Sequence, residues 1–539
     1  ISSKGKVLDN REGLITDGVK TELDSDRIEN IQGRIEGRKV VISSEEFDNR
    51  KGSVLSEEKI EIDSQRTSNT EGTILSNGKI GIMGVLDNTG GTVRSDAVNI
   101  DGKISSNSSG IISGFDELKI NGSSADNVNG KLESEGEIDI KVGILDNRSG
   151  KITGVEDVEI NGNLNNTEGE ILSLAKEVTI KSDDAKNIRG LIKGYMKTLL
   201  DVKGFKNKEG KVLSEGAVEL TTPDELIYEG IIEGSLYTAI TADKFTLNEE
   251  LNQDTLSITA DNGILLNNDL TARVLYLSTE SDFDNAHSVK GREYLSVEAK
   301  DISNDSQLLS DSTVYLKADN IYNRNRLEVR PDGTYRIRSG GSIEGQDVYL
   351  EVEGKVVNGI EEYMLGTYRR EDGVFVDNRS VVAENPALIS GTNSTTVIAG
   401  KLVNTGKIGE TGTTYIETEE KAENASIGEN VAGINGDKVS VKGKGGVHNI
   451  GGEIQGREIT HVISEKGKVI NEATITSYAT YGNQSIPGRE ETVRENIRNI
   501  GKIESPDGST YVEGDRGIEN IAGNIRGLSE TYFISKNGN

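Results

Sequence analysis

The sequence predicts an all-β protein folded as a right-handed parallel β-helix, with rungs of about 20 residues and hairpin insertions in its C-terminal half. Three observations support this prediction. One tetrapeptide recurs at nearly constant spacing, aliphatic and polar residues alternate between its copies, and the composition is rich in glycine but poor in large apolar side chains. Together they favour one small unit stacked many times over a compact globule.

The tetrapeptide is Asn-x-x-Gly, and its copies begin 19 to 21 residues apart throughout residues 1–220. The eleven asparagines are Asn10, Asn30, Asn49, Asn69, Asn88, Asn107, Asn127, Asn147, Asn166, Asn187 and Asn207. Asn and Gly both tolerate left-handed backbone, so the tetrapeptide predicts the turn between two strands. Two interpretations of the asparagines are open: their amides stack as a hydrogen-bonded ladder along the axis, or they only form turns at the surface.

Aliphatic residues mark the inward positions of each unit. The fifth residue after the Asn is aliphatic in every copy, and pairs such as Ile138/Ile140 follow with one residue between them. The residue two before the Asn is apolar in nine copies, with Thr67 and Ser105 as the exceptions. Alternation of this kind is the strand period and predicts three short strands per unit. Parallel strands that rise about 4.8 Å per rung then form a β-helix, and the crossover rule favours the right-handed form.

Composition narrows the function classes. Only 33% of the 539 residues are hydrophobic and 4% are aromatic, which suits the thin core of a solenoid. The net charge of −29 makes nucleic acids and anionic membrane surfaces poor partners. Cysteine is absent, so disulfides and thiolate chemistry are excluded, and no stretch reaches the roughly 18 apolar residues of a membrane span. Because both ends of the sequence lie within the repeat pattern, we expect an internal fragment of a longer chain.

The pattern predicts three domains. Residues 1–220 form the regular repeat array. Residues 221–357 keep the period with different corners and form a divergent β-helix segment, in which RPDGT marks a turn of an inserted loop around residues 326–341. Residues 358–539 return to the first pattern with insertions between rungs. The asparagines that continue the period are Asn268, Asn285, Asn304 and Asn323 in the second domain and Asn404, Asn449, Asn499 and Asn520 in the third.

Two insertions in the third domain, residues 361–378 and 476–496, carry aromatic and β-branched residues on both sides of a polar tip, and therefore predict hairpins. Tyrosine is concentrated in this half of the chain, since only Tyr195 precedes Tyr228. Tyrosine and arginine are favoured where a surface contacts a partner. The candidate partner-binding residues are Tyr363, Tyr368, Arg369, Arg370, Phe375, Tyr478, Tyr481 and Arg489. The alternative interpretation is that the tyrosines only shield loops and outer sheet faces.

The sequence shows no catalytic or metal-binding pattern. The three histidines, His287, His448 and His461, lack metal-ligand spacing and are interpreted as loop or corner residues. Neither a nucleophile elbow nor a Gly-rich phosphate loop is present. We therefore predict no enzymatic activity and no cofactor. The rival hypothesis is a β-helix polysaccharide lyase or hydrolase, but carboxylate pairs such as Asp183/Asp184 do not interrupt the first array.

The repeat N-x-x-G-x-I-x-G/S followed by V-x-I is seen in DNRSGKITGVEDVEI and DNTGGTVRSDAVNI. It resembles the filamentous haemagglutinin family over residues 1–220 and, less closely, over residues 400–539. These large exoproteins of two-partner secretion in Gram-negative bacteria include adhesins, haemolysins and the stalks of contact-dependent growth-inhibition effectors. Residues 361–410 look like the second repeat region of those effectors, in which residues 221–357 would correspond to a receptor-binding segment.

The resemblance implies a secreted, monomeric β-helical filament at the cell surface that acts in adhesion or as the stalk of a contact-dependent toxin. The implied partners are an outer-membrane transporter, through a region outside these residues, and a receptor on a host or target cell. A cytolysin of the same secretion class is an alternative that the acidic composition disfavours. The sequence departs from the family in two ways, because the secretion domain with its Asn-Pro motifs is missing and no toxin domain is visible.

Overall fold

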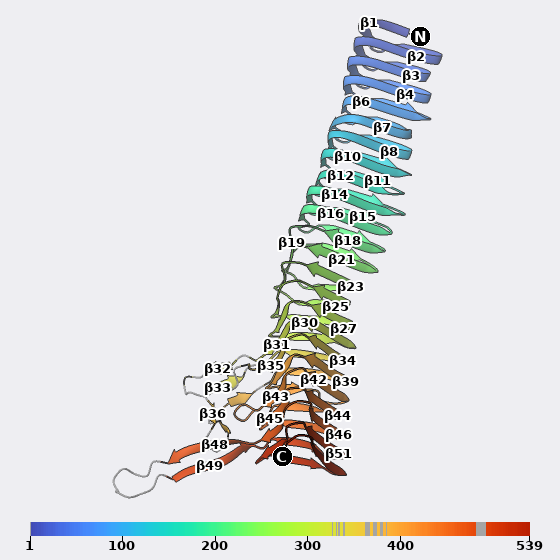
Figure 1. Ribbon diagram of the computed structural model, residues 1–539. Helices are drawn as coiled ribbons and strands as arrows, with labels where there is room; N and C mark the ends of the chain where they lie inside the picture. The colour runs from blue at the N-terminus through green and yellow to red at the C-terminus, as the bar shows by residue number, and fades with distance from the viewer. Residues whose placement is uncertain are drawn as a thin grey trace. The chain divides into compact units, whose positions relative to one another are not determined.

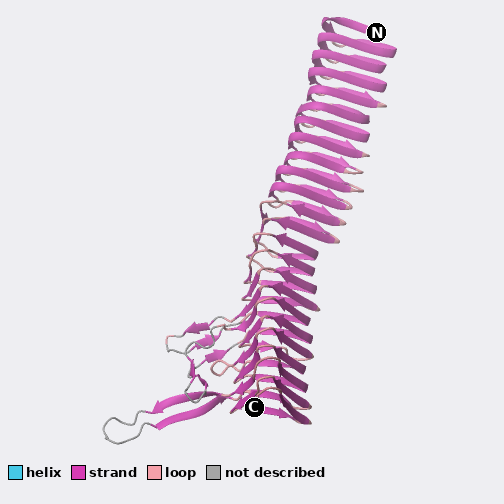
Figure 2. Cartoon of the chain, in the orientation of Figure 1, coloured by secondary structure: helices cyan, strands magenta, loops and turns pink. Residues whose placement is uncertain are grey.

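The computed structural model describes residues 2–325, 327–329, 331, 335–337, 340–361, 367–369, 375–377, 381–383, 385–480 and 492–538. Within these residues the chain forms strands and turns without a helix, which confirms the predicted all-β class (Figure 2). The chain divides into two compact units, residues 1–246 and 247–539, called unit 1 and unit 2 below.

Unit 1 is a parallel β-helix in which each rung pairs with the next (Figure 1). Its strands are β1 (Ser2–Asp9), β2 (Leu14–Glu29), β3 (Arg34–Asp48), β4 (Ser53–Ser68), β5 (Thr73–Ser76), β6 (Lys79–Asp87), β7 (Thr92–Ser106), β8 (Ile111–Asp126), β9 (Lys131–Ser134), β10 (Glu137–Asp146), β11 (Lys151–Gly154), β12 (Val158–Asn165), β13 (Glu170–Ser173), β14 (Glu177–Lys186), β15 (Leu191–Gly194), β16 (Lys197–Lys206), β17 (Lys211–Ser214), β18 (Ala217–Thr221), β19 (Glu225–Tyr228), β20 (Ile231–Gly234) and β21 (Tyr237–Ala242). β22 (Lys244–Leu247) follows.

Unit 2 has the same parallel architecture, with antiparallel pairs added to it. Its strands are β23 (Leu251–Ala260), β24 (Ile264–Leu266), β25 (Leu270–Ser278), β26 (Phe283–Asn285), β27 (Ser288–Glu298), β28 (Asp301–Asn304), β29 (Gln307–Ser310), β30 (Thr313–Ala318), β31 (Asn320–Arg324), β32 (Leu327–Val329), β33 (Tyr335–Ile337), β34 (Ser342–Val352), β35 (Lys355–Gly359), β36 (Thr367–Arg369), β37 (Phe375–Asp377), β38 (Val381–Ala383), β39 (Leu388–Ala399), β40 (Lys401–Asn404), β41 (Lys407–Ile408), β42 (Thr413–Thr418), β43 (Lys421–Ala425), β44 (Gly433–Gly443), β45 (Gly446–Ile450), β46 (Glu453–Ser464), β47 (Val469–Glu472), β48 (Thr474–Thr480), β49 (Thr492–Asn499), β50 (Lys502–Ser505), β51 (Ser509–Gly514), β52 (Ile518–Ile521), β53 (Asn524–Gly527) and β54 (Glu530–Ser535).

The core of unit 1 consists of columns of aliphatic side chains. The fifth residue after each repeat asparagine is fully buried in ten of the eleven copies, and Ile15 of the second rung is half-buried. Ile152 shows the packing, since it pairs in register with Leu132 on one side and Ile171 on the other, and all three are 0% exposed. Period-two alternation directs these side chains inward and leaves the intervening polar residues in water.

The two exceptions in the apolar column behave differently. Thr67 is fully buried and occupies the inward position with its small polar side chain. Ser105 does not, because a shift of register lets Ile104 pair with Leu86 and Ala125 instead. The alignment that assigned Ser105 to the inward column is therefore wrong by one residue, and Ile104, which is 1% exposed, fills the space.

The repeat asparagines form a continuous amide ladder along unit 1. Each Nδ2 donates to the Oδ1 of the next asparagine, at 2.6 Å from Asn10 to Asn30 and 2.8 Å from Asn187 to Asn207. Each asparagine is at most 7% exposed, and most are fully buried. The ladder interpretation is therefore confirmed, and the interpretation as surface turn formers is wrong.

The turn chemistry also differs from expectation. The left-handed residue is the third of each Asn-x-x-Gly, such as Glu12 with φ 54° or Lys51 with φ 55°, rather than the Asn or the Gly. The glycine is needed for a close approach, because a Cβ on Gly33 would collide with the backbone oxygen of Asn10 on the preceding rung. We call this residue the closing glycine of its turn.

A second ladder runs through unit 2 on a nine-stranded parallel sheet. Its asparagines are Asn285, Asn304, Asn323, Asn358, Asn404, Asn424, Asn449, Asn471 and Asn520, joined by bonds of 2.7 or 2.8 Å. Two predicted repeat positions lie outside it. Asn268 donates to the Asn248 backbone oxygen at 3.4 Å, and Asn499 ends β49 and donates to the Gly428 backbone oxygen at 2.7 Å. The ladder thus continues past insertions that interrupt the regular spacing of the repeats in the sequence.

Candidate functional site

Insertions leave unit 2 at one corner of the coil, inside the turn that follows a ladder asparagine. Gly341 has the surroundings of a closing glycine, since a Cβ there would collide with Asn304 and Asn323. The first backbone amide after each turn donates to the backbone oxygen of the residue that closes the turn of the preceding rung. The Leu388 amide donates to the Gly341 oxygen in this way at 3.0 Å. By this register the inserted segments are residues 324–340 after Asn323, 359–386 after Asn358, 425–431 after Asn424 and 472–500 after Asn471. Insertions far apart in sequence therefore emerge from the same corner (Figure 1).

Two of these insertions build one sheet. β36 pairs antiparallel with β37, and β48 pairs antiparallel with β49, so both predicted hairpins are confirmed as antiparallel strand pairs. β37 also pairs in parallel with β48, Phe375 against Thr474 and Val376 against Ile475. The result is the four-stranded sheet β36-β37-β48-β49, called the insertion sheet below. A second small sheet, β32-β33-β38, joins residues 327–337 to residues 381–383.

A buried carboxylate fastens the insertion sheet to the solenoid. Asp377 at the end of β37 is 0% exposed, and its Oδ2 accepts a hydrogen bond from the Gly428 amide at 2.8 Å. The backbone oxygen of Asp377 accepts from Arg498 Nη1 at 3.1 Å, and Oδ1 lies 4.0 Å from the same nitrogen. Asn499 donates to Gly428 at 2.7 Å from β49. Three separate insertions thus meet at Asp377, Gly428 and Arg498, which we call the latch.

Replacing Asp377 with alanine is expected to separate β37 from β48 while the solenoid stays folded. The change removes a fully buried carboxylate near Arg498, whose side chain is only 11% exposed, and breaking a buried ion pair costs about 3–5 kcal/mol. Hydrogen exchange at the Thr474 and Ile475 amides should accelerate. The control is Asp507→Ala, which removes an exposed carboxylate of the same unit. Unchanged exchange in both variants would show that strand pairing alone holds the sheet.

The predicted contact residues fall on this sheet or near it. Tyr368 and Arg369 lie in β36, Phe375 lies in β37, and Tyr478 lies in β48. The structure brings these strands together, but it describes their backbone and not their side chains. Tyr363, Arg370, Tyr481 and Arg489 lie outside the described residues. A contact role for all eight residues stays a prediction.

A charged cluster lies at the root of β48. His448 Nε2 and Glu472 Oε1 are 2.5 Å apart, and Lys421 Nζ lies 3.1 Å from His448 Nδ1 and 2.7 Å from Glu423 Oε1. Burial raises the pKa of Glu423, but the hydrogen bond from Lys421 and the charges of Lys421, Lys401 and His448 outweigh it, so this pKa lies below its ordinary value of 4.5. The carboxylate therefore contributes stability above pH 4.5 that is lost as the pH falls through the folded-state pKa.

Two histidines are not the loop or corner residues that the sequence predicts. His448 lies in β45, and His461 lies in β46 with its ring edge against Tyr511, at a centroid distance of 4.8 Å. His287 follows β26, and its Nδ1 lies 4.0 Å from Asp269 Oδ1. In the part of the chain that the structure describes, no group of three or more His, Asp or Glu side chains could hold a metal ion.

Six tyrosines form a column on the outer face of unit 2, which the sequence analysis did not predict. Its members, Tyr276, Tyr315, Tyr349, Tyr415, Tyr511 and Tyr532, share one register position. Adjacent rings stack, as for Tyr315 and Tyr349 at 5.6 Å and 8°. Burial and the acceptor Glu351 raise the pKa of Tyr315 to about 12, so its hydroxyl stays a donor. The signal was the middle residue of pairs such as Leu275/Leu277, and the column supports the shielding interpretation for these six tyrosines.

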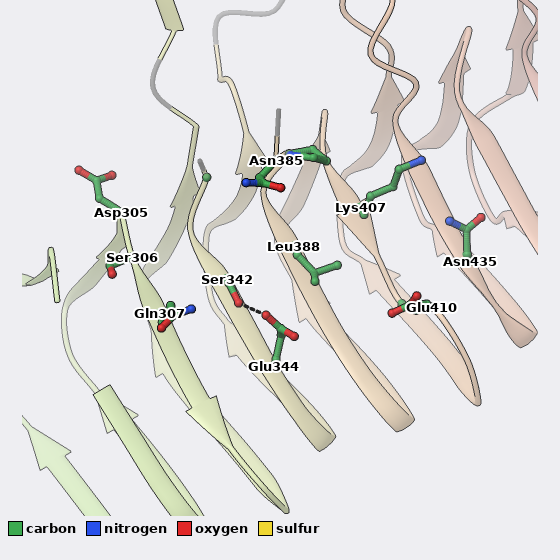
Figure 3. Close-up of a pocket in the computed structure, with 13 residues that line it drawn as sticks. Asp305, Ser306, Gln307, Ser342, Glu344, Asn385, Leu388, Lys407, Glu410 and Asn435 are labelled. Carbon is green, nitrogen blue, oxygen red and sulfur yellow. Dashed lines mark hydrogen bonds between the residues drawn. The ribbon is translucent and has the colours of Figure 1, made fainter. Parts of the chain in front are cut away.

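A groove lies beside the insertion exits, on the outer face of unit 2 (Figure 3). It has a volume of about 670 Å³ and is lined by residues of five successive rungs, from Gln307 in β29 to Asn435 in β44. Gly340 and Asn385, which end the stretches 324–340 and 359–386 near their return to the coil, form part of one wall. Most of the other lining side chains are polar.

Comparison with known proteins identifies the repeats. The haemagglutinin repeat family model matches residues 2–113, 84–185 and 198–268. No curated protein and no solved structure matches the chain. Among the described residues, no helix has the length and apolar character needed to span a membrane.

Proposed function

The chain belongs, through the haemagglutinin repeats of residues 2–268, to the filamentous haemagglutinin family, and we propose that it is a segment of a secreted exoprotein that mediates adhesion at the bacterial surface. Proteins of this family are generally secreted or surface-associated and serve structural and adhesive roles. The match confirms the resemblance stated for residues 1–220 and extends it to residue 268.

The observation that carries the proposal is the insertion sheet. Two insertions about 100 residues apart in the sequence leave the same corner and pair β37 with β48, so they present one joint surface on a repetitive scaffold. Different contacts hold the scaffold and the surface: buried aliphatic columns and the amide ladder join the rungs, and the latch joins the insertion sheet to them. Function in such folds resides in segments positioned by a rigid framework.

The family resemblance suggests finer roles, which are part of the same proposal. The chain is exported through an outer-membrane transporter of a two-partner system in a Gram-negative bacterium and acts as a monomeric filament that meets a receptor on a host or target cell. It serves as an adhesin or as the stalk of a contact-dependent toxin, without catalysis of its own. Residues 221–357 form a second candidate receptor-binding region, and residues 358–539 carry the two hairpins of the insertion sheet.

Replacing residues 363–375 of the first insertion with a Gly-Ser segment of equal length, which leaves Val376 and Asp377 in place, is expected to weaken attachment of protein-coated beads to target cells about tenfold or more, as loss of a central contact patch does. A milder double variant, Tyr368→Ala with Tyr478→Ala, should also weaken attachment. The matched control is Tyr195→Ala, a tyrosine of unit 1 that is 53% exposed. Circular dichroism should not change in any variant.

Attachment that equals that of the unmodified chain in both insertion variants would remove this sheet as the contact surface. Loss of attachment in the Tyr195 control as well would indicate a nonspecific effect of tyrosine removal. A haemolysis assay separates adhesion from the cytolysin alternative, because an adhesin leaves erythrocytes intact.

A further inference from the structure

Small residues form part of the lining of the groove beside the insertion exits, among them Ser342 of β34 and Gly409, which follows β41. Gly409 has φ 67°, and a Cβ there would collide with Thr414 and Asn435. This position of the lining therefore requires glycine.

Side chains around the hollow keep their hydrogen-bonding capacity. Within the described part of the chain, five of them form no side-chain hydrogen bond or ion pair with another residue: Gln307, Asn385, Lys407, Glu410 and Asn435. Several charged side chains elsewhere on the outer face of unit 2 are paired, as Lys442 is with Glu417 at 3.1 Å and Glu465 at 2.7 Å. The groove thus concentrates polar groups that are available to a ligand.

The chemistry of these groups indicates a polyhydroxyl ligand. Amides of Gln307, Asn385 and Asn435 both donate and accept, as a sugar hydroxyl does, and carboxylates accept from hydroxyls. Leu388 lies between these groups in Figure 3 and offers an apolar contact for the carbon-bound face of a sugar ring. Pockets that combine a few polar groups with apolar contact are typical of ligand sites.

The charge of the lining side chains and the length of the groove narrow the class of ligand further. Three carboxylates, Asp305, Glu344 and Glu410, line the groove against the single ammonium of Lys407, which disfavours an anionic ligand. Five rungs at about 4.8 Å each give a groove roughly 19 Å long, which suits a chain of several units. We infer that the groove binds a neutral oligosaccharide that lies across the rungs. This inference deepens the proposed adhesive function by naming a ligand class for unit 2.

The test measures binding of the full 539-residue chain to printed neutral, sialylated and sulfated oligosaccharides, with a lysine-rich peptide as a further probe. The variant Gln307→Ala with Asn435→Ala should weaken binding to a neutral oligosaccharide about tenfold, as expected for the loss of two or more hydrogen bonds. The matched control is Gln455→Ala, which pairs in register with Asn435 one rung further and does not line the groove. It should bind within about twofold of the unmodified chain.

If the double variant unfolds, Glu410→Gln at the exposed rim replaces it, with a smaller loss expected. Absence of binding to any neutral oligosaccharide, preference for sulfated chains or the basic peptide, or equal binding by the double variant and the control would each overturn the inference. The double variant Tyr368→Ala with Tyr478→Ala distinguishes oligosaccharide binding in the groove from cell attachment through the insertion sheet. Neutral-sugar binding with unchanged cell attachment in that variant rejects the insertion sheet and leaves the groove standing.

Discussion

Replacing Ile152 with aspartate is expected to destabilise unit 1 by about 4 kcal/mol or more, because a carboxylate would enter a column where the residue is 0% exposed. Leu132 and Ile171 lie above and below it in register and are equally buried, so no water or cation can reach the charge. The damage should extend to both neighbouring rungs, since each rung is stabilised mainly by its neighbours. Denaturant unfolding followed by circular dichroism measures the loss, and hydrogen exchange locates it.

Two controls separate burial from the chemical change. Ile144→Asp makes the same substitution at a side chain that is 58% exposed and should alter stability by less than about 0.5 kcal/mol. Glu156→Asp should also be nearly silent, because the ion pair of Glu156 with Lys176 is solvent-exposed and such pairs contribute about 0–1 kcal/mol. Equal destabilisation by the changes at Ile152 and Ile144 would refute a dry aliphatic column.

Replacing Asn147 with alanine should destabilise unit 1 by about 2–4 kcal/mol, although no charge is involved. Its Nδ2 donates to Asn166 Oδ1 at 2.7 Å and its Oδ1 accepts from Asn127 Nδ2 at the same distance. Alanine would deprive two buried amides of these bonds, and buried polar groups without partners are costly. Loss of protection in hydrogen exchange should reach the turns on both sides of the gap.

The matched control for the ladder is Asn161→Ala, because Asn161 is an exposed asparagine on the same solenoid. It should unfold at the same denaturant concentration as the unmodified chain. If the ladder contributed little to stability, alanine at Asn147 and alanine at Asn161 would cause similar, small losses of stability.

Much of the fold follows from local pattern. The spacing of Asn147 from its neighbours predicted the rung length, and alternation around Ile138 and Ile140 predicted inward positions that are 1% and 0% exposed. The hairpins also followed, because β-branched and aromatic residues flank polar tips within a single short segment. These features depend on residues close in sequence, so the sequence contains the whole signal.

The site was only partly predictable. Residues 361–378 and 476–496 each predicted a hairpin, but nothing in either segment indicated that β37 pairs with β48 or that Asp377 meets Gly428 and Arg498. The groove was missed for the same reason, since its lining residues come from five rungs that are separated in sequence by the insertions.

The sequence alone determined the repeat period, the all-β class, the aliphatic columns and the family, because the same local pattern of residues recurs in every repeat. Tertiary structure decided whether asparagines stack or merely turn, which residue of the turn is left-handed, and that Ile104 rather than Ser105 faces inward. It also decided which insertions join. Each of these depends on contacts between rungs, where a neighbour about 20 residues or more away sets the geometry that local preference leaves open.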